Sequence, residues 1–275
     1  MRIPTSVALC LLLALAATPE PSSGTHAPAL PAATAPPLLE WRVVSRRPHD
    51  PGAFTQGLQL DEEGRLFEST GLYGRSTLRE VDPLSGTVLR AAALPDSQFG
   101  EGLALVRDRL VQITWREGIA NAWDAESFEL LDTFEYDGEG WGLCHDGEHL
   151  VMSDGSDRLT FRDPETFKVE GSVRVVHAGL GELRLNELEC VDGVVWANLW
   201  LTDTIVRIDP GSGALTGRLE LGELRREVLA DPATVDAAEA PDVLNGIAWD
   251  EEAGTFLLTG KLWPTLFEVR LLEPG

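Results

Sequence analysis

The chain has 275 residues, 43% of them hydrophobic, and its 45 acidic residues outweigh 22 basic ones to give a net charge of −23. This length and apolar content suffice for one large or two small folded domains and exclude a largely disordered chain. The negative charge argues against nucleic acid and anionic membranes as partners. It fits equally a soluble surface or a preference for cationic ligands.

The first 25 residues have the anatomy of a secretory signal peptide. Arg2 precedes an apolar run from Val7 to Ala17, and small and polar residues follow it. The run is shorter than a membrane-spanning helix needs, and Cys10 lies inside it, which argues against a lipoprotein attachment site. Residues 26–38 are rich in Ala, Pro and Thr and predict a flexible tether. We therefore expect an exported protein, periplasmic or secreted, with one folded domain over residues 39–275.

Two cysteines, Cys144 and Cys190, remain after removal of the predicted signal peptide. In an oxidising compartment they could pair, and the sequence leaves this open.

Five similar segments recur along the rest of the chain, with a period of about 40 to 45 residues that is typical of four-stranded propeller blades. Each opens with a small or acidic residue before Leu or Ile and enters a second apolar run. The segments begin at Phe54, Phe99, Gly140, Leu185 and Leu244.

A second kind of segment follows each of the first four: "LREVDPLSGTVLRAAAL", "NAWDAESFELLDTFEY", "LTFRDPETFKVEGSVRV" and "IVRIDPGSGALTGRLEL". Two alternating strands flank an Asp-Pro or Asp-Ala turn in each, which predicts a hairpin. Two hairpins per unit give four strands, so we expect an all-β fold, a five-bladed β-propeller. The fifth unit lacks its outermost strand, and "LEWRVVSRRPHD" near the start of the domain is predicted to supply it and close the ring.

An acidic insertion, residues 222–243, separates the fourth and fifth units and has a short helical pattern around Leu224 to Ala230. It predicts either a surface loop at one rim or a flap beside a site.

Polar residues interrupt the apolar repeat at the start of each innermost strand. The positions are Gln56, Glu101, Trp141, Asn186 with Glu187, and Asn245. In a propeller these side chains face the central channel, where they either form a site or hydrogen-bond one another to hold the ring together. The second interpretation is favoured for Glu187 and Asn245, because most buried polar groups have structural partners.

The ends of the second strands add further unusual residues, namely Trp115, Asn198 with Trp200, and Lys261 with Trp263. A carboxylate, a lysine, amides and aromatic walls at one mouth predict a ligand pocket. None of the five histidines shows the close grouping of a catalytic zinc site, so we expect no metal and no cofactor. A structural ion at Glu187 is a less favoured alternative.

The motifs "FTQGL", "FGEGL", "GEGWGL", "LNELE", "ANLWLTD", "VLNGIAWD" and "TGKLWP" resemble those of the plant-type glutaminyl-peptide cyclotransferases of plants and bacteria. The resemblance runs from about Trp41 to Leu271 and touches every blade. It implies a five-bladed propeller that converts the N-terminal glutamine of peptides to pyroglutamate and ammonia.

Carried over by position, the resemblance implies that Glu101, Lys261 and Asn186 are catalytic. Substrate-binding roles fall on Phe54, Gln56, Phe99, Trp115, Trp141 and Trp200. Two features depart from the family pattern: the cysteines in neighbouring units, and the acid-rich insertion.

The residues also suggest a chemistry. Ring closure needs a group that accepts a proton and later donates one, and Glu101 beside aromatic walls fits that need. Lys261 and Asn186 are candidate donors to the oxygen that becomes negative, and Gln56 is a candidate to orient the carboxamide.

Two alternatives remain open. A calcium-dependent hydrolase of the lactonase type would use Glu101, Asn186, Glu187 and Asn245 as ligands, although Lys261 in the same ring opposes a metal. A non-catalytic module would merely bind peptide amino termini. We expect a monomer that acts on peptides or proteins beginning with glutamine, without nucleic acid or membrane as partners of the mature form.

Overall fold

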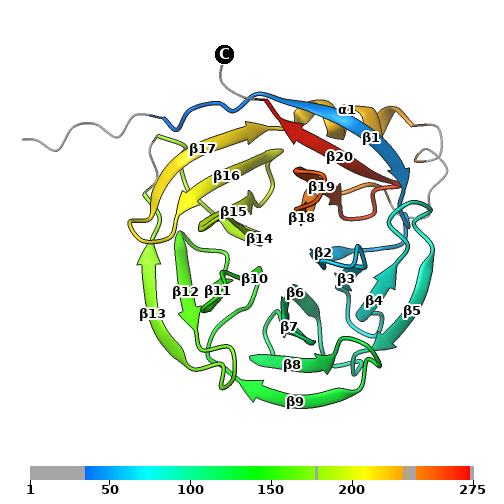
Figure 1. Cartoon of the computed structure of the whole chain (residues 1–275), viewed down its shortest axis with the longest axis vertical. Helices are drawn as coiled ribbons and strands as arrows, with labels where there is room; N and C mark the ends of the chain where they lie inside the picture. Colours follow the sequence, from blue (N-terminus) through cyan, green and yellow to red (C-terminus); the bar gives the residue numbers. More distant parts are fainter. Residues whose placement is uncertain (1–34, 177–178, 232–233, 235–239, 273–275) are drawn as a thin grey trace, which may run out of the picture. The chain divides into compact units, whose positions relative to one another are not determined.

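The structure is a computed structural model, and it describes residues 35–176, 179–231, 234 and 240–272. Within this part, strands form five four-stranded antiparallel sheets arranged as blades around a central axis (Figure 1), which confirms the predicted propeller. The predicted signal peptide and residues 26–34 of the predicted tether lie outside the described residues. Among the residues described, no helix has the length and apolar character needed to cross a membrane.

Each sheet runs from an innermost strand at the axis to an outermost strand at the rim. The first consists of β2 (Thr55–Leu60), β3 (Leu66–Thr70), β4 (Thr77–Val81) and β5 (Val88–Ala93). The second consists of β6 (Gly100–Val106), β7 (Arg109–Thr114), β8 (Ile119–Asp124) and β9 (Leu130–Glu135). The third consists of β10 (Leu143–His145), β11 (Leu150–Ser153), β12 (Arg158–Arg162) and β13 (Val169–Arg174). The fourth consists of β14 (Leu185–Val191), β15 (Val194–Leu199), β16 (Thr204–Asp209) and β17 (Ala214–Glu220).

The fifth sheet closes the ring with strands from both ends of the domain. It contains β18 (Leu244–Asp250), β19 (Thr255–Gly260), β20 (Thr265–Leu271) and, outermost, β1 (Trp41–Pro48). β1 pairs antiparallel with β20, from Trp41 opposite Leu271 to Pro48 opposite Thr265. The blue and red strands lie side by side in Figure 1. The predicted closure by the N-terminal strand is confirmed.

Ordered pairing begins slightly before the predicted domain start. The backbone N–H of Arg218 donates to the carbonyl oxygen of Pro37, and the N–H of Leu39 donates to the carbonyl oxygen of Arg218, both at 2.9 Å. Pro37 and Leu38 therefore lie along β17, just before the predicted start of the domain.

Burial decreases from the axis to the rim. β6 is buried at every position except half-buried Leu105, whereas the residues of β5 are exposed or half-buried. Apolar side chains fill the spaces between neighbouring sheets; Phe67, Leu103 and Trp123 belong to one such cluster. Hydrophobic burial between blades is thus the main force that holds the ring together.

The predicted Asp turns are present between the third and fourth strands. Asp82 accepts hydrogen bonds at Oδ1 from the backbone N–H groups of Leu84 and Ser85, at 3.0 and 2.7 Å. Asp124, Asp163 and Asp209 accept equivalent bonds from the residues that follow them. An Asp side chain that bonds to the backbone two or three residues later mimics a turn, so it fixes each hairpin locally.

Irregular pairing at the start of the innermost strands changes the direction in which the polar side chains of the repeat point. The register shifts between Thr55 and Gly57, and again at the start of β6, β14 and β18. A bulge leaves one or two residues unpaired and bends the strand. The residues released in this way include Gln56, Glu101, Asn186 and Asn245.

In four blades a glycine follows the residue that interrupts the apolar repeat, and this glycine lets the innermost strands approach each other around the axis. A Cβ on Gly102 would lie 2.4 Å from the backbone nitrogen of Leu143, and one on Gly142 would lie 2.0 Å from the carbonyl oxygen of Asn186. No side chain fits at these distances. In the fourth blade Glu187 stands where the others have glycine, and its side chain enters the channel.

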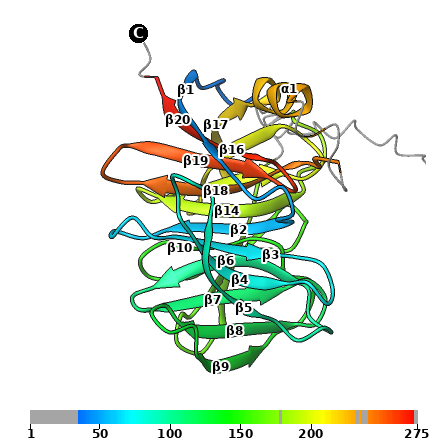
Figure 2. The same ribbon diagram turned by 90° about the vertical axis from the view of Figure 1, so that its right-hand side faces the viewer.

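The insertion contains the predicted helix, α1 (Gly222–Ala230), beside β1 and β17 (Figures 1 and 2). Leu224 and Val228 are its buried residues, and Glu227 forms an ion pair with Arg46 of β1. Residues 232–233 and 235–239 of the insertion lie outside the described residues. Elsewhere, Cys144 of β10 and Cys190 of β14 form a disulfide that links the third and fourth blades.

Candidate active site

A cavity of about 630 Å³ opens at the mouth of the channel where the innermost strands begin. It brings together nine residues that were predicted as catalytic or substrate-binding: Phe54, Gln56, Phe99, Glu101, Trp115, Trp141, Asn186, Trp200 and Lys261. They come from all five blades, so only ring closure makes them neighbours.

Glu101 lies in the bulge at the start of β6 and is only 5% exposed. Its Oε1 accepts a hydrogen bond of 3.0 Å from Nε2 of Gln56. Burial raises the pKa of its carboxyl well above the ordinary value; the positive charge of Lys261 opposes this shift, and the charges of Glu139 and Glu117 add to it. Removal of this carboxyl from water thus favours its protonated form, and the nearby ammonium group favours its ionised form.

Lys261 follows β19 and is 6% exposed. Its Nζ lies 4.8 Å from the centroid of the Phe54 ring, within the range of a cation–π contact. Burial lowers the pKa of the ammonium group, while the charges of Glu101 and Asp242 act against that shift. Glu101 and Lys261 thus influence each other's ionisation across one cavity.

A short chain of amides orients the groups around Glu101. Asn245 donates from Nδ2 to the carbonyl oxygen of Thr55 at 2.9 Å and to Oε1 of Gln56 at 3.3 Å. With its oxygen occupied in this way, Gln56 presents its NH₂ group to Glu101. Asn245 is itself fully buried, so its role is structural, as the favoured interpretation predicted.

Aromatic rings form two groups on the cavity wall. The Phe99 ring makes edge contacts with Phe54 and Trp115, at centroid distances of 6.2 and 5.5 Å. Trp141 and Trp200 meet edge to face at 5.3 Å. Indole and phenyl faces of this kind hold an apolar side chain in a defined conformation and exclude water.

Glu139 joins the two aromatic groups, and the sequence did not single it out. Its Oε2 accepts from Nε1 of Trp115 at 2.9 Å and from Nε1 of Trp141 at 3.0 Å, while Oε1 accepts from Arg116. Partial burial alone would raise its pKa, but these hydrogen bonds outweigh burial and lower it. The signal was present, since Glu139 lies two residues before Trp141 in the motif "GEGWGL".

Other residues of the cavity lining also went unnoticed in the sequence, because they lie in loops without a repeat. These are Leu72, Arg116, Asp154, Gly155, Glu182, Arg184, Leu201 and Asp242. Arg184 lies over the Trp200 ring at 5.3 Å, and Asp242 reaches the cavity from the described part of the acidic insertion.

The remaining unusual residues of the repeat hold the ring together. Glu187 is fully buried, and its two oxygens accept from the backbone N–H groups of Leu58 and Ile247, at 3.3 and 2.9 Å. Asn198 accepts from the N–H of Gly246 at 3.2 Å. Because both Glu187 oxygens bind backbone amides, the alternative of a structural ion at this residue finds no support. Within the described residues, no cluster of three or more His, Cys, Asp or Glu side chains is placed to hold a metal.

Comparisons with known proteins agree with the resemblance in the sequence motifs. Residues 9–271 match the sequence model of a family described as Glutamine cyclotransferase. Over 237 residues the chain is 42% identical to a glutaminyl-peptide cyclotransferase of Arabidopsis thaliana, covering 86% of this chain and 72% of the plant protein. It is also similar to the crystal structure of Myxococcus xanthus glutaminyl cyclase, with a TM-score of 0.77 and 38% identity, over 86% of this chain and 98% of the bacterial one. The chain therefore belongs to the glutamine cyclotransferase family.

Proposed function

We propose that this glutaminyl cyclase acts on peptides and proteins that begin with glutamine, and that Glu101 moves the protons of the reaction. The observation that carries the proposal is the buried carboxyl of Glu101, whose pKa is raised and which faces a buried lysine in a cavity walled by indole rings. The reaction is an intramolecular aminolysis that needs a proton acceptor and a proton donor in sequence.

Ring closure joins the α-amino nitrogen of the substrate to the Cδ carbon of its own side chain. The ionised Glu101 carboxylate accepts a proton from the attacking nitrogen, and the resulting carboxylic acid donates it to the departing amide nitrogen. The bond between Cδ and that nitrogen breaks, ammonia leaves, and the five-membered lactam remains. The raised pKa suits this cycle, because it makes the carboxylate a stronger base toward the attacking nitrogen, and the carboxylic acid formed can then protonate the departing nitrogen.

Lys261 and Asn186 supply donors for the carbonyl oxygen, which becomes negative when the amine attacks. The Lys261 ammonium reaches the cavity from the turn after β19. Asn186 lines the same cavity, and the Ser153 hydroxyl holds its backbone by donating to the backbone carbonyl oxygen of Asn186 at 2.6 Å. A fixed donor in a dry site stabilises such an oxyanion by about 3 to 4 kcal/mol.

The aromatic walls fold the glutamine side chain so that nitrogen and carbon meet. A flexible side chain samples many conformations in water, and confinement between the Phe99 group and the Trp141–Trp200 pair restricts it to the compact ones. Holding reacting atoms in attack geometry lowers the barrier through entropy, without added chemistry.

The alternatives have less support from the residues. A calcium site built from Glu101, Asn186, Glu187 and Asn245 would need free oxygens, whereas both oxygens of Glu187 accept from backbone N–H groups and Lys261 adds a positive charge. A module that only binds amino termini has no need for a carboxyl with a raised pKa.

The experiment is an assay of the purified full-length chain with a glutamine-led dipeptide and a chelator. We expect ammonia and pyroglutamyl peptide in equal amounts, and no ammonia from the same peptide with an acetylated amino terminus. Binding of the dipeptide without ammonia release would favour the binding module, and activity that appears only with calcium and a lactone would favour the hydrolase.

We also propose that the protein is exported and works as a monomer. The apolar run between residues 7 and 17 and the disulfide between Cys144 and Cys190 support export, since disulfides persist mainly in oxidising compartments. Detection of the processed chain outside the cytoplasm, and its elution at the mass of one chain, would test both statements.

A further inference from the structure

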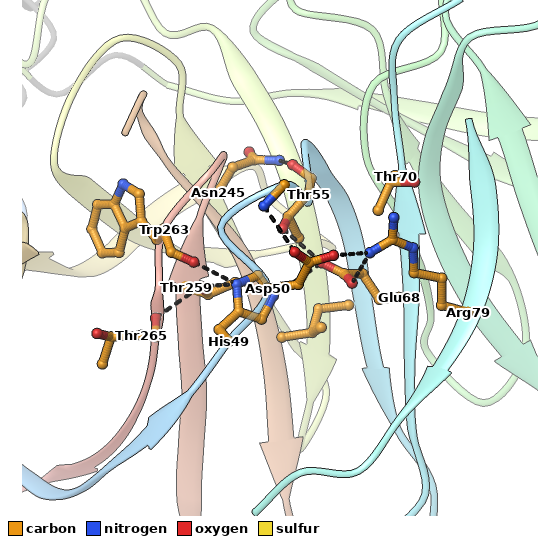
Figure 3. Close-up of polar contacts among 12 residues, drawn as sticks. His49, Asp50, Thr55, Glu68, Thr70, Arg79, Asn245, Thr259, Trp263 and Thr265 are labelled. Atoms are coloured by element: carbon orange, nitrogen blue, oxygen red, sulfur yellow. Dashed lines mark hydrogen bonds and ion pairs between the residues drawn. The ribbon is translucent and has the colours of Figure 1, made fainter. Parts of the chain in front are cut away.

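A buried ionisable pair lies at the seam where the fifth blade meets the first, outside the lining of the cavity. His49 follows β1, and Glu68 lies in β3; their side chains are 2% and 1% exposed and approach to 3.1 Å between Nε2 and Oε1 (Figure 3). The mechanism above uses neither residue. Burying two ionisable groups is costly unless their partners compensate, so the pair needs an explanation.

The hydrogen bonds determine where the protons are. Nδ1 of His49 lies 2.7 Å from the carbonyl oxygen of Trp263, which can only accept, so Nδ1 carries a hydrogen. The nearby Thr259 hydroxyl gives its own hydrogen to the carbonyl oxygen of Thr265. One proton therefore lies between Nε2 of His49 and Glu68.

The surrounding charges favour an imidazolium and a carboxylate. Burial alone would lower the pKa of His49, but the charge and hydrogen bond of Glu68 and the Trp263 carbonyl outweigh it and raise that pKa. For Glu68, burial alone would raise the pKa, but His49 and Arg79 outweigh burial and lower that pKa. Asp50, beside the pair, is itself bonded to Arg79 at 2.7 Å.

One arm of this network leads to Lys261. The Trp263 carbonyl that His49 holds is two residues beyond Lys261, in a turn where Leu262 adopts a φ of 62°. A leucine in the left-handed region is unfavourable and needs external support. That support comes from the His49 segment, because the N–H of Leu262 donates to the carbonyl oxygen of Ala53 at 2.7 Å and the N–H of His49 donates to that of Pro264.

The other arm leads to Gln56. The Thr55 hydroxyl donates to Oε1 of Glu68 at 2.7 Å, and Gln56, the next residue, bonds to Glu101. The pair thus connects the two strand ends that place Lys261 and Gln56 on either side of Glu101.

We propose that His49 and Glu68 form a positioning pair. The pair fixes the turn that carries Lys261 and the start of the strand that carries Gln56, so that the side chains of Lys261 and Gln56 both face Glu101. The inference rests on the proposed function for its kinetic effect, but its structural effect is independent of that function. Neither residue contacts the cavity, so both act through others.

The test compares the same one-methylene deletion at two buried carboxylates. Glu68→Asp keeps the charge but withdraws it from His49. Glu268→Asp is the matched control: Glu268 also lies in the fifth-blade seam and accepts from a threonine, Thr255, at 3.2 Å, but its other partners, Ser45 and Arg47, lead away from the cavity. Glu68→Gln serves as a rescue variant, because its amide can donate to a neutral His49.

For Glu68→Asp and for His49→Ala we expect kcat to fall about 10- to 100-fold with a smaller change in KM, as misplaced catalytic groups do. Glu68→Gln should retain more of kcat than Glu68→Asp. Glu268→Asp should lower the melting temperature and leave kcat unchanged. Unchanged kcat in folded Glu68→Asp and His49→Ala, or an equal loss in Glu268→Asp, would overturn the inference.

A second readout does not need turnover. The chain contains two lysines, Lys168 and Lys261, so ¹³C-lysine NMR gives one signal for the site and one exposed reference. Glu68→Asp should move the Lys261 signal and shift its pKa toward the ordinary value, while Glu268→Asp leaves it in place. A Lys261 signal whose position and pKa do not change in Glu68→Asp would contradict the role of the pair, whether or not the proposed reaction occurs. A wild-type protein without activity would refute the proposed reaction alone.

Discussion

The two ends of the propeller channel carry the same kind of residue in opposite surroundings. At one end Glu101 is buried beside the cavity, with one hydrogen bond from Gln56 and a lysine nearby. Deeper in the channel the Glu187 carboxylate binds two backbone amides from two other blades, and Glu189 follows toward the far opening, where its Oε1 accepts from the N–H of Trp249. Burial alone therefore does not separate the two carboxyl groups; what sets Glu101 apart is its incomplete hydrogen bonding inside a cavity.

The largest expected effect separates Glu101 from Glu187. Glu101→Gln removes the group that we propose accepts and donates protons but keeps an oxygen for Gln56, so kcat should fall about 10²- to 10⁴-fold with little change in the free energy of unfolding. Ammonia release and chemical denaturation measure the two quantities.

Glu187→Gln should behave in the opposite way. Its amide nitrogen would face a backbone N–H, a donor against a donor, at a cost of about 1 to 3 kcal/mol in the free energy of unfolding. Its kcat should stay at the wild-type value. Equal effects of the two substitutions on kcat would remove the distinction between the two ends.

Lys261→Met is expected to lower kcat about 10²- to 10³-fold, because it removes a proposed donor to the oxyanion. It should also move the acidic limb of kcat/KM to higher pH, since the lysine charge holds down the pKa of Glu101. A pH profile of the variant checks the direction. A limb that stays in place would show that the two groups do not interact.

Glu189→Gln tests the far end through stability. The pKa of Glu189 in the folded chain is about 8, raised chiefly by burial, above its value in the unfolded chain. The folded state therefore gains from the bound proton at low pH and loses that gain as pH rises toward 8. Glutamine does not titrate, so the variant should be more stable than the wild type above pH 8 by roughly 5 kcal/mol, from about 1.4 kcal/mol for each pKa unit between 4.5 and about 8, and equal to it near pH 4. Denaturation curves at the two pH values measure this, and equal stability at high pH would contradict the raised pKa.

Glu139→Gln should have the smallest effect, near tenfold on KM, because one amide oxygen cannot replace the carboxylate that fixes Trp115, Trp141 and Arg116. Its charge raises the pKa of Glu101, so the acidic limb should move to lower pH, opposite to Lys261→Met. Shifts of the same sign in the two variants would contradict the electrostatic account.

Much of the molecule could be predicted from the sequence, because its features are local and repeated. The five starts, the Asp turns and the missing outer strand predicted the blades and their closure, and the interrupting polar residues predicted the cavity lining. The register of the bulges could not be predicted, since it depends on pairing between strands. Glu139 was missed because its role depends on two indoles brought together by folding.

The different roles of the residues that interrupt the repeat could not be predicted from the sequence either. Asn186 and Asn245 occupy equivalent positions in neighbouring blades, yet one lines the cavity and the other bonds to Thr55 and Gln56. The difference arises from which strand lies beside each amide, and a repeat pattern contains no such information.

The central claim is that Glu101 and Lys261 form an interacting acid and cation in one buried cavity. The ¹³C titration of Lys261, in the wild type and in Glu101→Gln, tests it most directly, because the glutamate charge acts to raise the lysine pKa. We predict a lysine pKa below the ordinary value in the wild type and a further fall in Glu101→Gln. An ordinary pKa that the substitution does not change would contradict the account.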